Sequence, residues 1–446
     1  MPDHATSTNP AVQAQLDRLT MLSPGKDVLG LERIAALLDR LGNPHLHLPP
    51  VFHVSGTNGK GSTCAFLRGA IEAAGFTAHV YSSPHLVRFN ERIRVAGQLI
   101  DDTTLSALLS EVLDHAEGLE ASFFEVTTAV AFCAFARTKA DACIIEVGLG
   151  GRLDATNVLV KPVACGIASL GLDHEAFLLA AEDGVPDMPP LDRIAFEKAG
   201  IAKSGAPLVT QKYSASMAKT VAAQASLHNA ILHARGENWD AAVYDARLHY
   251  RDAIGKLNLP LPRMSGTHQA DNAALAVAML RHQTAIQIPE AALSAAMEWT
   301  RWPARMQTLA AGPLTEILPE GSNIWLDGGH NPDAGAAIAK TLENSASVHV
   351  IIGMLKNKDA LGFLAPFASK IETLTAVPIA GHEHHTPSEL CDLARSKLQI
   401  TNAQAAGDIV AALELMTGQQ EPAQVLICGS LYLAGEVLRL NDQVPD

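Results

Sequence analysis

A short glycine-rich segment constrains this chain more than any other feature of its sequence. Residues 56–62 follow the apolar residues 51–54, which are typical of a buried strand. Residues 63–74 then predict a helix, which ends before Gly75, and a second apolar run ends near Tyr81. A strand, a loop, a helix and a strand in this order predict a βαβ unit, and therefore a parallel sheet with right-handed crossovers.

The same segment predicts a phosphate site, because backbone N–H groups and the helix dipole meet where a helix follows such a loop. Lys60 would neutralise the β- and γ-phosphates of ATP. Gly61 follows the lysine where a Walker loop has Ser or Thr, so a magnesium ion would be bound by Ser62 or Thr63, and we favour Ser62. The alternative, a turn without a ligand, would leave Lys60 without an anion. The predicted nucleotide-binding residues are Gly56, Thr57, Asn58, Gly59, Lys60, Gly61 and Ser62.

Polar residues also follow other predicted strands, at the sheet edge where ligands of α/β folds collect. Glu146 ends the apolar run 140–147, where P-loop proteins keep the acid that contacts magnesium. The alternative interpretation of Glu146 is a carboxylate at a strand end that is only hydrated. Ser83 follows the second strand, where a bare turn would explain it equally well. His174 follows the strand at residues 163–169 and could supply an imidazole ligand, although a lone histidine is weak evidence of a metal site.

Several further groups have two interpretations. Lys198 taken alone is a solvated lysine at a helix end. Arg88, Arg92 and Arg94 could form a cationic pocket, or they could be alternating charges on an edge strand. Residues 327–332 are dense in polar groups, but a turn alone favours Asp, Gly, Asn and Pro. The histidines of residues 382–385 lack the i, i+4 spacing of metal ligands, so we expect no metal there.

The chain length of 446 residues favours two domains. Trp302 and Pro303 interrupt a helical pattern, and strands predicted at residues 324–326, 348–352, 373–377 and 425–428 begin a second α/β alternation. We therefore expect one domain over residues 1–303 and another over residues 304–446.

The charge balance excludes some classes of partner. There are 33 Lys and Arg residues against 47 Asp and Glu, so we expect no attraction to nucleic acid or to an anionic membrane. The six scattered cysteines show no CxxC pairing, which indicates reduced thiols in the cytoplasm. Neither a secretory signal nor a stretch long enough to span a membrane is expected from the sequence.

Eight blocks of sequence, in order, resemble the folylpolyglutamate synthase and dihydrofolate synthase family of the Mur ligase superfamily, in its bifunctional bacterial form. They are residues 30–34, 56–62, 83–86, 90–93, 172–174, 197–201, 302–305 and 327–332. The resemblance implies an α/β fold: a P-loop Mur-ligase-like ATPase domain with a parallel sheet and a smaller Rossmann-like C-terminal domain, with the active site in the cleft between them. Residues 178–190 look longer than the family usually allows, which leaves the path of that loop open.

The resemblance also implies residue roles. It assigns Ser83, Glu146 and His174 to magnesium, with two ions expected, and it makes Lys198 a carbamylated side chain. The residues that would bind ATP or glutamate are Asn272, Arg305, Asp327 and His330. The residues that would bind the pterin substrate are Phe124 and Asp154, and we add Arg92 from the predicted cationic pocket. The side chains expected to take part in catalysis are Lys60, Lys198, His174 and His330.

The expected reaction is ATP-dependent ligation of L-glutamate to dihydropteroate and to reduced folates through an acyl phosphate, by a cytoplasmic monomer. Three alternatives remain. The protein could be a polyglutamate synthase only, or a cell-wall Mur ligase, which residues 83–93 and the short N-terminus count against. It could also be a nucleotide switch, although residues 357–359 are one residue short of a guanine-reading motif.

Overall fold

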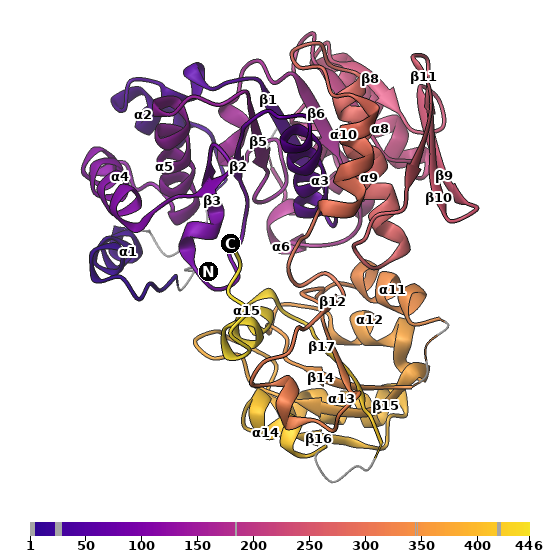
Figure 1. Cartoon of the computed structure of the whole chain (residues 1–446). Coiled ribbons are helices and arrows are strands. Elements are labelled where there is room, and N and C mark those ends of the chain that lie inside the picture. Colours follow the sequence, from indigo (N-terminus) through magenta and orange to yellow (C-terminus); the bar gives the residue numbers. More distant parts are fainter. Residues whose placement is uncertain (1–4, 23–28, 183–184, 344, 346, 417–420) are drawn as a thin grey trace. The chain divides into compact units, whose positions relative to one another are not determined.

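The computed structural model describes residues 5–22, 29–182, 185–343, 345, 347–416 and 421–446 (Figure 1). Two compact units emerge from the internal contacts. The N-terminal unit consists of Met1–His85, Phe89–Arg263 and Gln269–Arg301, and the C-terminal unit of Leu86–Arg88, Met264–His268 and Trp302–Asp446. The C-terminal unit thus includes two short segments that come before its main part in the chain.

The N-terminal unit is built on an eight-stranded sheet in the order β4-β3-β2-β5-β1-β6-β7-β8. Its strands are β1 (Val51–Ser55), β2 (Ala78–Tyr81), β3 (Ile93–Val95), β4 (Gln98–Leu99), β5 (Ala142–Glu146), β6 (Ala164–Ile167), β7 (Pro207–Thr210) and β8 (Ile231–Ala234). All neighbours from β2 to β8 are parallel, which confirms the predicted parallel sheet. The antiparallel edge formed by β3 and β4 was not predicted.

Helices cover both faces of this sheet, and this is why its central strands read as unbroken apolar runs. His53, Ile145 and Cys165 share one row across β1, β5 and β6. The opposite face includes Gly166, where an added Cβ would lie 2.3 Å from Met279 Sδ of α9. The helices of the unit are α1 (Pro10–Leu22), α2 (Glu32–Arg40), η1 (Pro44–His47), α3 (Lys60–Ala73), η2 (Phe89–Arg92), α4 (Asp102–Ala116), α5 (Phe123–Arg137), η3 (Ala155–Val158), α6 (Glu175–Leu178), α7 (Pro190–Ala199), α8 (Ala215–Leu227), α9 (Thr267–Arg281) and α10 (Glu290–Trp299).

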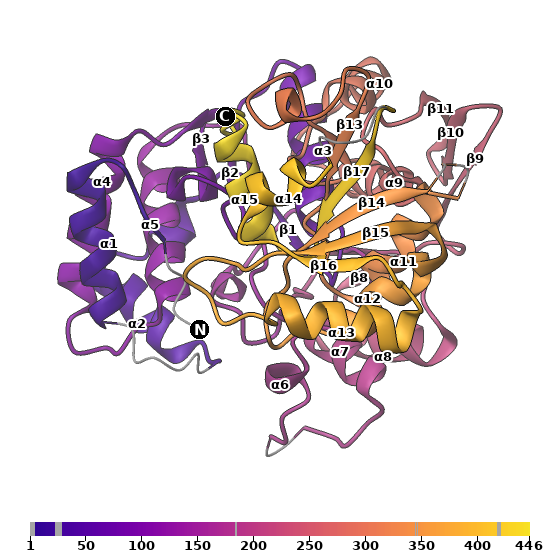
Figure 2. The same ribbon diagram turned by 90° about the horizontal axis from the view of Figure 1, so that it is seen from below.

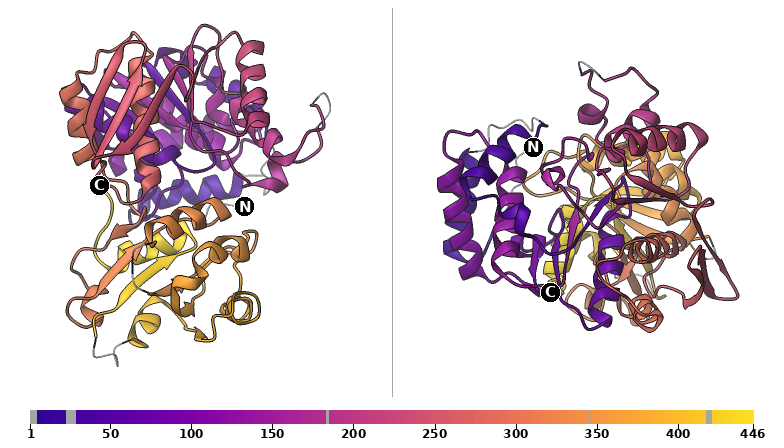
Figure 3. Two further views of the ribbon diagram at one scale, coloured as in Figure 1. Left: turned by 90° about the vertical axis from the view of Figure 1, so that its right-hand side faces the viewer. Right: turned by 90° about the horizontal axis from the view of Figure 1, so that it is seen from above.

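A three-stranded antiparallel sheet forms a separate ribbon in the N-terminal unit (Figure 3). It consists of β9 (Trp239–Tyr244), β10 (Arg247–Asp252) and β11 (Gly255–Pro260). Asp252 at its end receives two hydrogen bonds from Arg281 of α9, at 2.6 and 2.7 Å. This sheet was not predicted from the sequence, because its strands alternate polar and apolar residues and only one face is buried.

The C-terminal unit has a six-stranded sheet in the order β12-β13-β17-β14-β15-β16, whose central strands lie side by side in Figure 2. Its strands are β12 (Gln307–Thr308), β13 (Asn323–Leu326), β14 (Val348–Ile352), β15 (Ile371–Ala376), β16 (Ala403–Ala405) and β17 (Gln424–Cys428), and its helices are η4 (Thr315–Ile317), α11 (Pro332–Thr341), α12 (Ala360–Leu364), η5 (Ala365–Lys370), α13 (Pro387–Leu398), α14 (Ile409–Glu414) and α15 (Leu431–Leu440). All strand pairs except β12–β13 are parallel. The four strands predicted here are confirmed, whereas β12 and β16 were missed.

Two apolar layers sandwich this second sheet. Val350 and Ile352 of β14 pack in a cluster with Phe363 and Leu390, whereas Ile351 packs in a separate cluster with α14 and α15 residues. Alternate residues of one strand therefore serve opposite faces, as the pleat requires. None of the helices in the described part of the chain combines the length and the apolar character needed to cross a bilayer.

Candidate active site

The glycine-rich loop joins β1 to α3, and the helix begins earlier than expected. Residues 60–62 are already helical, so α3 starts at Lys60 and not at residue 63. Gly59 precedes it with φ +86°, a left-handed conformation that favours glycine. A Cβ on Gly59 would lie 2.3 Å from Asn272 Oδ1. The side chain of Asn272, one of the predicted nucleotide-binding residues, therefore lies against the loop.

Residues that follow β6 hold this loop in place. Thr57 N donates to Ser169 O at 2.7 Å, and Thr57 Oγ1 donates to Gly171 O at 2.9 Å. Ser169 Oγ donates to Asn58 O at 3.1 Å. Because these bonds come from the chain itself, the loop has its shape before any ligand arrives. Ser169 and Gly171 were not predicted as site residues, although their position just after a strand was a usable signal.

Two lysines converge on one backbone oxygen of the loop. Lys60 Nζ and Lys198 Nζ each lie 3.0 Å from Gly56 O. Lys198 belongs to α7 and is only 4% exposed. Burial, and then the charge of Lys60, lowers the pKa of Lys198 to about 7, although Asp173, Asp154 and Glu197 oppose the shift. The structure thus places a lysine with a large neutral fraction at pH 7 beside the phosphate loop, which excludes the solvated-lysine interpretation.

Glu146 and Ser83 meet at the ends of neighbouring strands. Glu146, at the end of β5, is 4% exposed, and Ser83 N donates to its Oε2 at 3.3 Å. His174 directly precedes α6 and has φ +53°, and its backbone N–H is fixed by Asp173 Oδ1 at 2.8 Å. Ser83 and Glu146, two of the predicted magnesium ligands, are thus joined through the backbone of Ser83, and the backbone of His174 is fixed by its aspartate neighbour.

The donor set suits magnesium. Among the described residues, no three His, Cys, Asp or Glu side chains lie close enough together to form a complete protein metal site. Magnesium needs no such cage, because it keeps several waters and uses one or two carboxylates together with phosphate oxygens. Ser62 and Thr63 bury their hydroxyls at the start of α3, and Thr63 Oγ1 has no hydrogen-bond partner in the described part of the chain. The residues present therefore fit a magnesium–nucleotide complex.

The carboxylate of Asp154 organises the turn after β5. Its Oδ2 accepts from Leu149 N at 2.8 Å, and its Oδ1 accepts from Thr156 N at 3.0 Å. Burial raises the pKa of Asp154, and these hydrogen bonds oppose that shift. Both oxygens are thus bound by the protein, so any contribution to a pterin pocket would come through the shape of this turn.

Phe124 forms an aromatic wall beside the same turn. A Cβ on Gly148 would lie 2.3 Å from Phe124 Cζ, and the rings of Phe124 and Tyr81 are 5.9 Å apart. Gly148 follows the strand that carries Glu146. The predicted pterin-binding ring of Phe124 therefore contacts Gly148, which lies two residues after Glu146, the predicted metal ligand, in the chain.

The three arginines of the predicted cationic pocket have separate surroundings. Arg92 is 2% exposed and donates from Nε to His85 Nδ1 at 2.9 Å. Its guanidinium stacks on Phe89 and Phe123, with 5.6 and 5.5 Å to the ring centroids. Arg94 donates to Gly97 O, whereas Arg88 belongs to the C-terminal unit and donates to Pro445 O. Arg92 is thus a buried cation and not a solvated edge-strand charge.

The candidate residues of the C-terminal unit gather at the turn after β13, which carries Asp327 and His330 and meets Arg305 from the segment before β12. Asp327 Oδ2 accepts from Met306 N at 2.8 Å, and Asp327 Oδ1 accepts from Gly329 N at 2.7 Å. Arg305 Nη1 would lie 3.0 Å from a Cβ on Gly328, and His330 Nδ1 lies 3.2 Å from Gly328 O. Arg305, Asp327 and His330 are therefore brought together, whereas the sequence linked them only through the role that the family resemblance implies.

Comparisons with known proteins agree with this geometry. A family model described as "Dihydrofolate synthetase, C-terminal domain" matches residues 313–440. The dihydrofolate synthase/folylpolyglutamate synthase of Escherichia coli (strain K12) is 34% identical over 421 residues, which cover 93% of this chain and 92% of that protein. The folylpolyglutamate synthase of Lacticaseibacillus casei is 31% identical over 430 residues, covering 91% of this chain and 92% of that protein.

Solved structures show the same architecture. The E. coli FolC structure in complex with DHPP and ADP has a TM-score of 0.84 at 32% identity and covers 98% of both chains. A bifunctional folylpolyglutamate synthase/dihydrofolate synthase with Mn, AMPPNP and L-glutamate bound has a TM-score of 0.82 at 29% identity and covers 97% of this chain and 99% of that one. The predicted P-loop Mur-ligase-like α/β fold is thereby confirmed, and the chain belongs to the dihydrofolate synthase/folylpolyglutamate synthase family.

Proposed function

We propose that this protein joins L-glutamate through its amine to the carboxylate of dihydropteroate and of reduced folates, converting ATP to ADP and phosphate. One observation carries this proposal. Lys60 and the buried Lys198 meet at the same carbonyl oxygen of a preformed phosphate loop. A loop that only bound a nucleotide would need the first lysine, but not a second lysine whose pKa is lowered to about 7.

The proposed chemistry begins with the substrate carboxylate, which is a poor electrophile. Its oxygen attacks the γ-phosphorus of ATP, and the bond between that phosphorus and the oxygen bridging it to the β-phosphate breaks. ADP then departs, and the substrate carries an acyl phosphate. Such a transfer depends on positioning and charge neutralisation. Lys60 and the backbone N–H groups of the loop would supply both, because the loop is already held by Thr57 and Asn58. The glutamate amine then attacks the acyl carbon, loses a proton, and phosphate departs from the tetrahedral intermediate.

Magnesium would neutralise the phosphate charges when it is bound. We assign Ser62, Ser83, Glu146 and His174 to it, supported by the buried Glu146 at a strand end and by the small number of protein ligands that this ion needs. A manganese ion accompanies AMPPNP in a structure of a related protein. A carbamate on Lys198 would add two oxygen ligands and a negative charge for a second ion, where an ammonium would repel it.

The remaining assignments rest on the family. Asn272, Arg305, Asp327 and His330 would bind ATP or glutamate, and Phe124, Asp154 and Arg92 would bind or shape the pterin site. The DHPP and L-glutamate in the structures of related proteins support small-molecule substrates for this chain. We further propose a functional division at residues 303 and 304, and a cytoplasmic monomer.

Carbamylation of Lys198 should depend on pH near neutrality, because carbon dioxide reacts with a neutral amine. A pKa of about 7 leaves about half of the Lys198 amines neutral at pH 7, whereas an ordinary lysine has only about one in several thousand. At a fixed pressure of ¹³C-labelled carbon dioxide, the carbamate NMR signal should rise between about pH 6 and pH 8. Lys198→Arg should lack the signal, and a signal that rose only above pH 9 would contradict the assignment.

Both ligations should occur in one active site. The purified protein should release ADP with dihydropteroate plus glutamate and also with a reduced folate plus glutamate. The chemistry is common to the two reactions, and only the position of the pterin must differ. Lys60→Ala should abolish both activities together, which rules out a contaminating enzyme as the source of either.

Each outcome of this assay separates the proposal from an alternative. Extension of reduced folate without any product from dihydropteroate would make the protein a polyglutamate synthase only and would remove the pterin assignments of Phe124 and Asp154. Steady ATP hydrolysis that ignored glutamate would favour a nucleotide switch. Asp359, part of the weak guanine-reading motif, caps α12 by accepting from Gly362 N at 2.9 Å, which gives it a structural role instead.

A further inference from the structure

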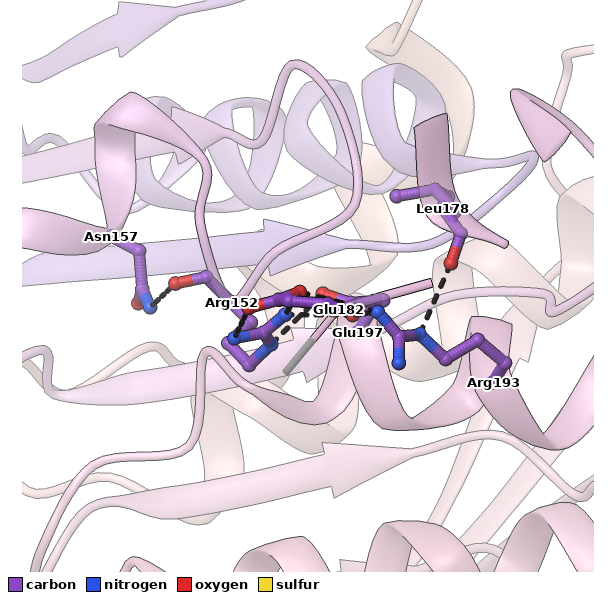
Figure 4. Close-up of polar contacts among 6 residues, drawn as sticks. All are labelled: Arg152, Asn157, Leu178, Glu182, Arg193 and Glu197. Carbon is purple, nitrogen blue, oxygen red and sulfur yellow. Dashed lines mark hydrogen bonds and ion pairs between the residues drawn. The ribbon is translucent and has the colours of Figure 1, made fainter. Parts of the chain in front are cut away.

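Four charged side chains fasten the long segment between α6 and α7 to the rest of the N-terminal unit (Figure 4). They are Arg152, Glu182, Arg193 and Glu197. Glu182 lies in the segment at residues 178–190 that looked longer than its family usually allows, and residues 183–184 of that segment lie outside the described residues. The other three belong to the turn after β5 and to α7.

The contacts form a closed network. Arg152 uses both Nη atoms on the two oxygens of Glu182 and also donates from Nε to Glu197 Oε2 at 3.1 Å. Arg193 Nη2 lies 3.3 Å from Glu182 Oε2 and 2.8 Å from Glu197 Oε1. Each arginine thus bridges both glutamates, and the two guanidiniums also flank the ring of Phe196 at 5.4 and 5.6 Å.

The side chains of the network become more exposed from its centre outward. The side chain of Glu197 is 4% exposed and that of Arg193 is 9% exposed, whereas that of Glu182 is 38% exposed. Glu197 is therefore a buried carboxylate that needs both arginines, and Glu182 closes the network from the solvent side. The hydrogen bonds from Arg152 lower the pKa of Glu182, so this carboxylate is charged at neutral pH.

The network reaches two candidate site residues through short covalent and packed connections. Glu197 directly precedes Lys198 in α7, and its carbonyl oxygen accepts from Arg152 N at 2.8 Å. Arg193 Nε donates to Leu178 O at 3.1 Å, at the end of the short helix α6 that begins after His174. Leu178 also packs on the turn after β5, because a Cβ on Gly150 would lie 2.9 Å from Leu178 Cδ2.

We propose that Glu182 is a positioning residue for the metal–nucleotide site: by closing this ion network it fixes the one-turn helix that directly follows His174, and so the place of His174 relative to Lys198. The inference deepens the proposed function and rests on it for the roles of these two residues. A helix of only four residues has little stability of its own, so its position depends on its tertiary contacts. Groups that orient metal ligands from behind are often worth tenfold or more in metal affinity.

Charge balance supports the same conclusion. With Glu182 the network holds two positive and two negative groups, so its net charge is zero. Without it, two arginines would share only Glu197, which would leave one uncompensated positive charge between the turn after β5 and the end of α6 and would hold Arg152 and Arg193 less firmly. The competing explanation is a partly exposed ion pair with no consequence for the site, as is common at protein surfaces.

The test compares three variants of the full-length protein. Glu182→Gln removes the charge and keeps the shape, and Glu182→Asp keeps the charge on a shorter side chain. Asp187→Asn is the matched control, because Asp187 is an exposed acid of the same segment. Binding of Mn²⁺ is measured by electron paramagnetic resonance in the presence of AMPPNP, together with the melting temperature and the magnesium dependence of ADP release.

Glu182→Gln should weaken Mn²⁺ binding about tenfold, with the melting temperature within a few degrees of the wild type because the group is partly exposed. Glu182→Asp should restore part of the affinity, and Asp187→Asn should behave as the wild type. Unchanged Mn²⁺ binding by Glu182→Gln, or equal weakening by Asp187→Asn, would overturn the proposal. If the wild type binds Mn²⁺ with AMPPNP but ligates no glutamate, the proposed function fails while the role of Glu182 in metal binding can still be read.

Discussion

Replacing Lys60 with alanine should lower the rate of ADP release by at least about 100-fold, in line with the loss of a group that neutralises transferred phosphate charge. Lys60 begins α3, and its Nζ lies 3.0 Å from Gly56 O and 3.2 Å from Thr57 O. In this position the side chain lies over the loop that would hold the phosphates. The fold should tolerate the change, because Thr57, Asn58 and Ser169 hold the backbone of the loop through hydrogen bonds that remain when those of the lysine are lost.

The measurement is glutamate-dependent ADP release over a range of ATP concentrations up to saturation, with each acceptor in turn. Lys219→Ala is the matched control, because Lys219 is an exposed lysine of α8. A Lys60→Ala protein with near-normal turnover and an unchanged KM for ATP would remove the loop from the mechanism. If Lys60→Ala raised the KM for ATP and left kcat unchanged, Lys60 would be a group that binds ATP equally well in the ground state and in the transition state.

Replacing Lys198 with alanine should also lower turnover by at least about 100-fold, because a divalent ion that neutralises the transferred phosphoryl group is worth several kcal/mol. The side chain is buried, lies 3.0 Å from Gly56 O and has its pKa lowered to about 7. If its carbamate is a metal ligand, a small carboxylic acid supplied from solution can occupy the space that the alanine leaves. Propionate should therefore restore part of the activity of Lys198→Ala.

Two controls keep this result interpretable. Lys198→Met fills the same space without a nitrogen, so it should retain the melting temperature but show no rescue by propionate. Lys161→Ala, at an exposed position, should retain full activity. Full turnover by Lys198→Met, or a free ammonium at Lys198 in an active crystal loaded with metal, would end the carbamate assignment.

The motifs near strand ends could be predicted because their signals are local. An apolar run, a glycine-rich turn and a helix predict where β1 and α3 lie, and the carboxyl edge of a parallel sheet then gathers Lys60, Ser83 and Glu146 without further information. The strands of the C-terminal unit follow from the same alternation of apolar runs and helices. The three-stranded sheet of β9, β10 and β11 gave a weaker signal, since its strands alternate polar and apolar residues and are buried on one face only.

The sequence by itself determined the family, the phosphate loop and the identity of most candidate residues, because these depend on residue type and order along the chain. Only the tertiary structure decided their chemical state. Lys198 has a lowered pKa because folding buries it beside Lys60, which lies 138 positions earlier in the chain. Glu182 joins Arg152 and Arg193 because α7 packs against the turn after β5. Desolvation and charge pairing depend on distances in space, and no local pattern of residues reports them.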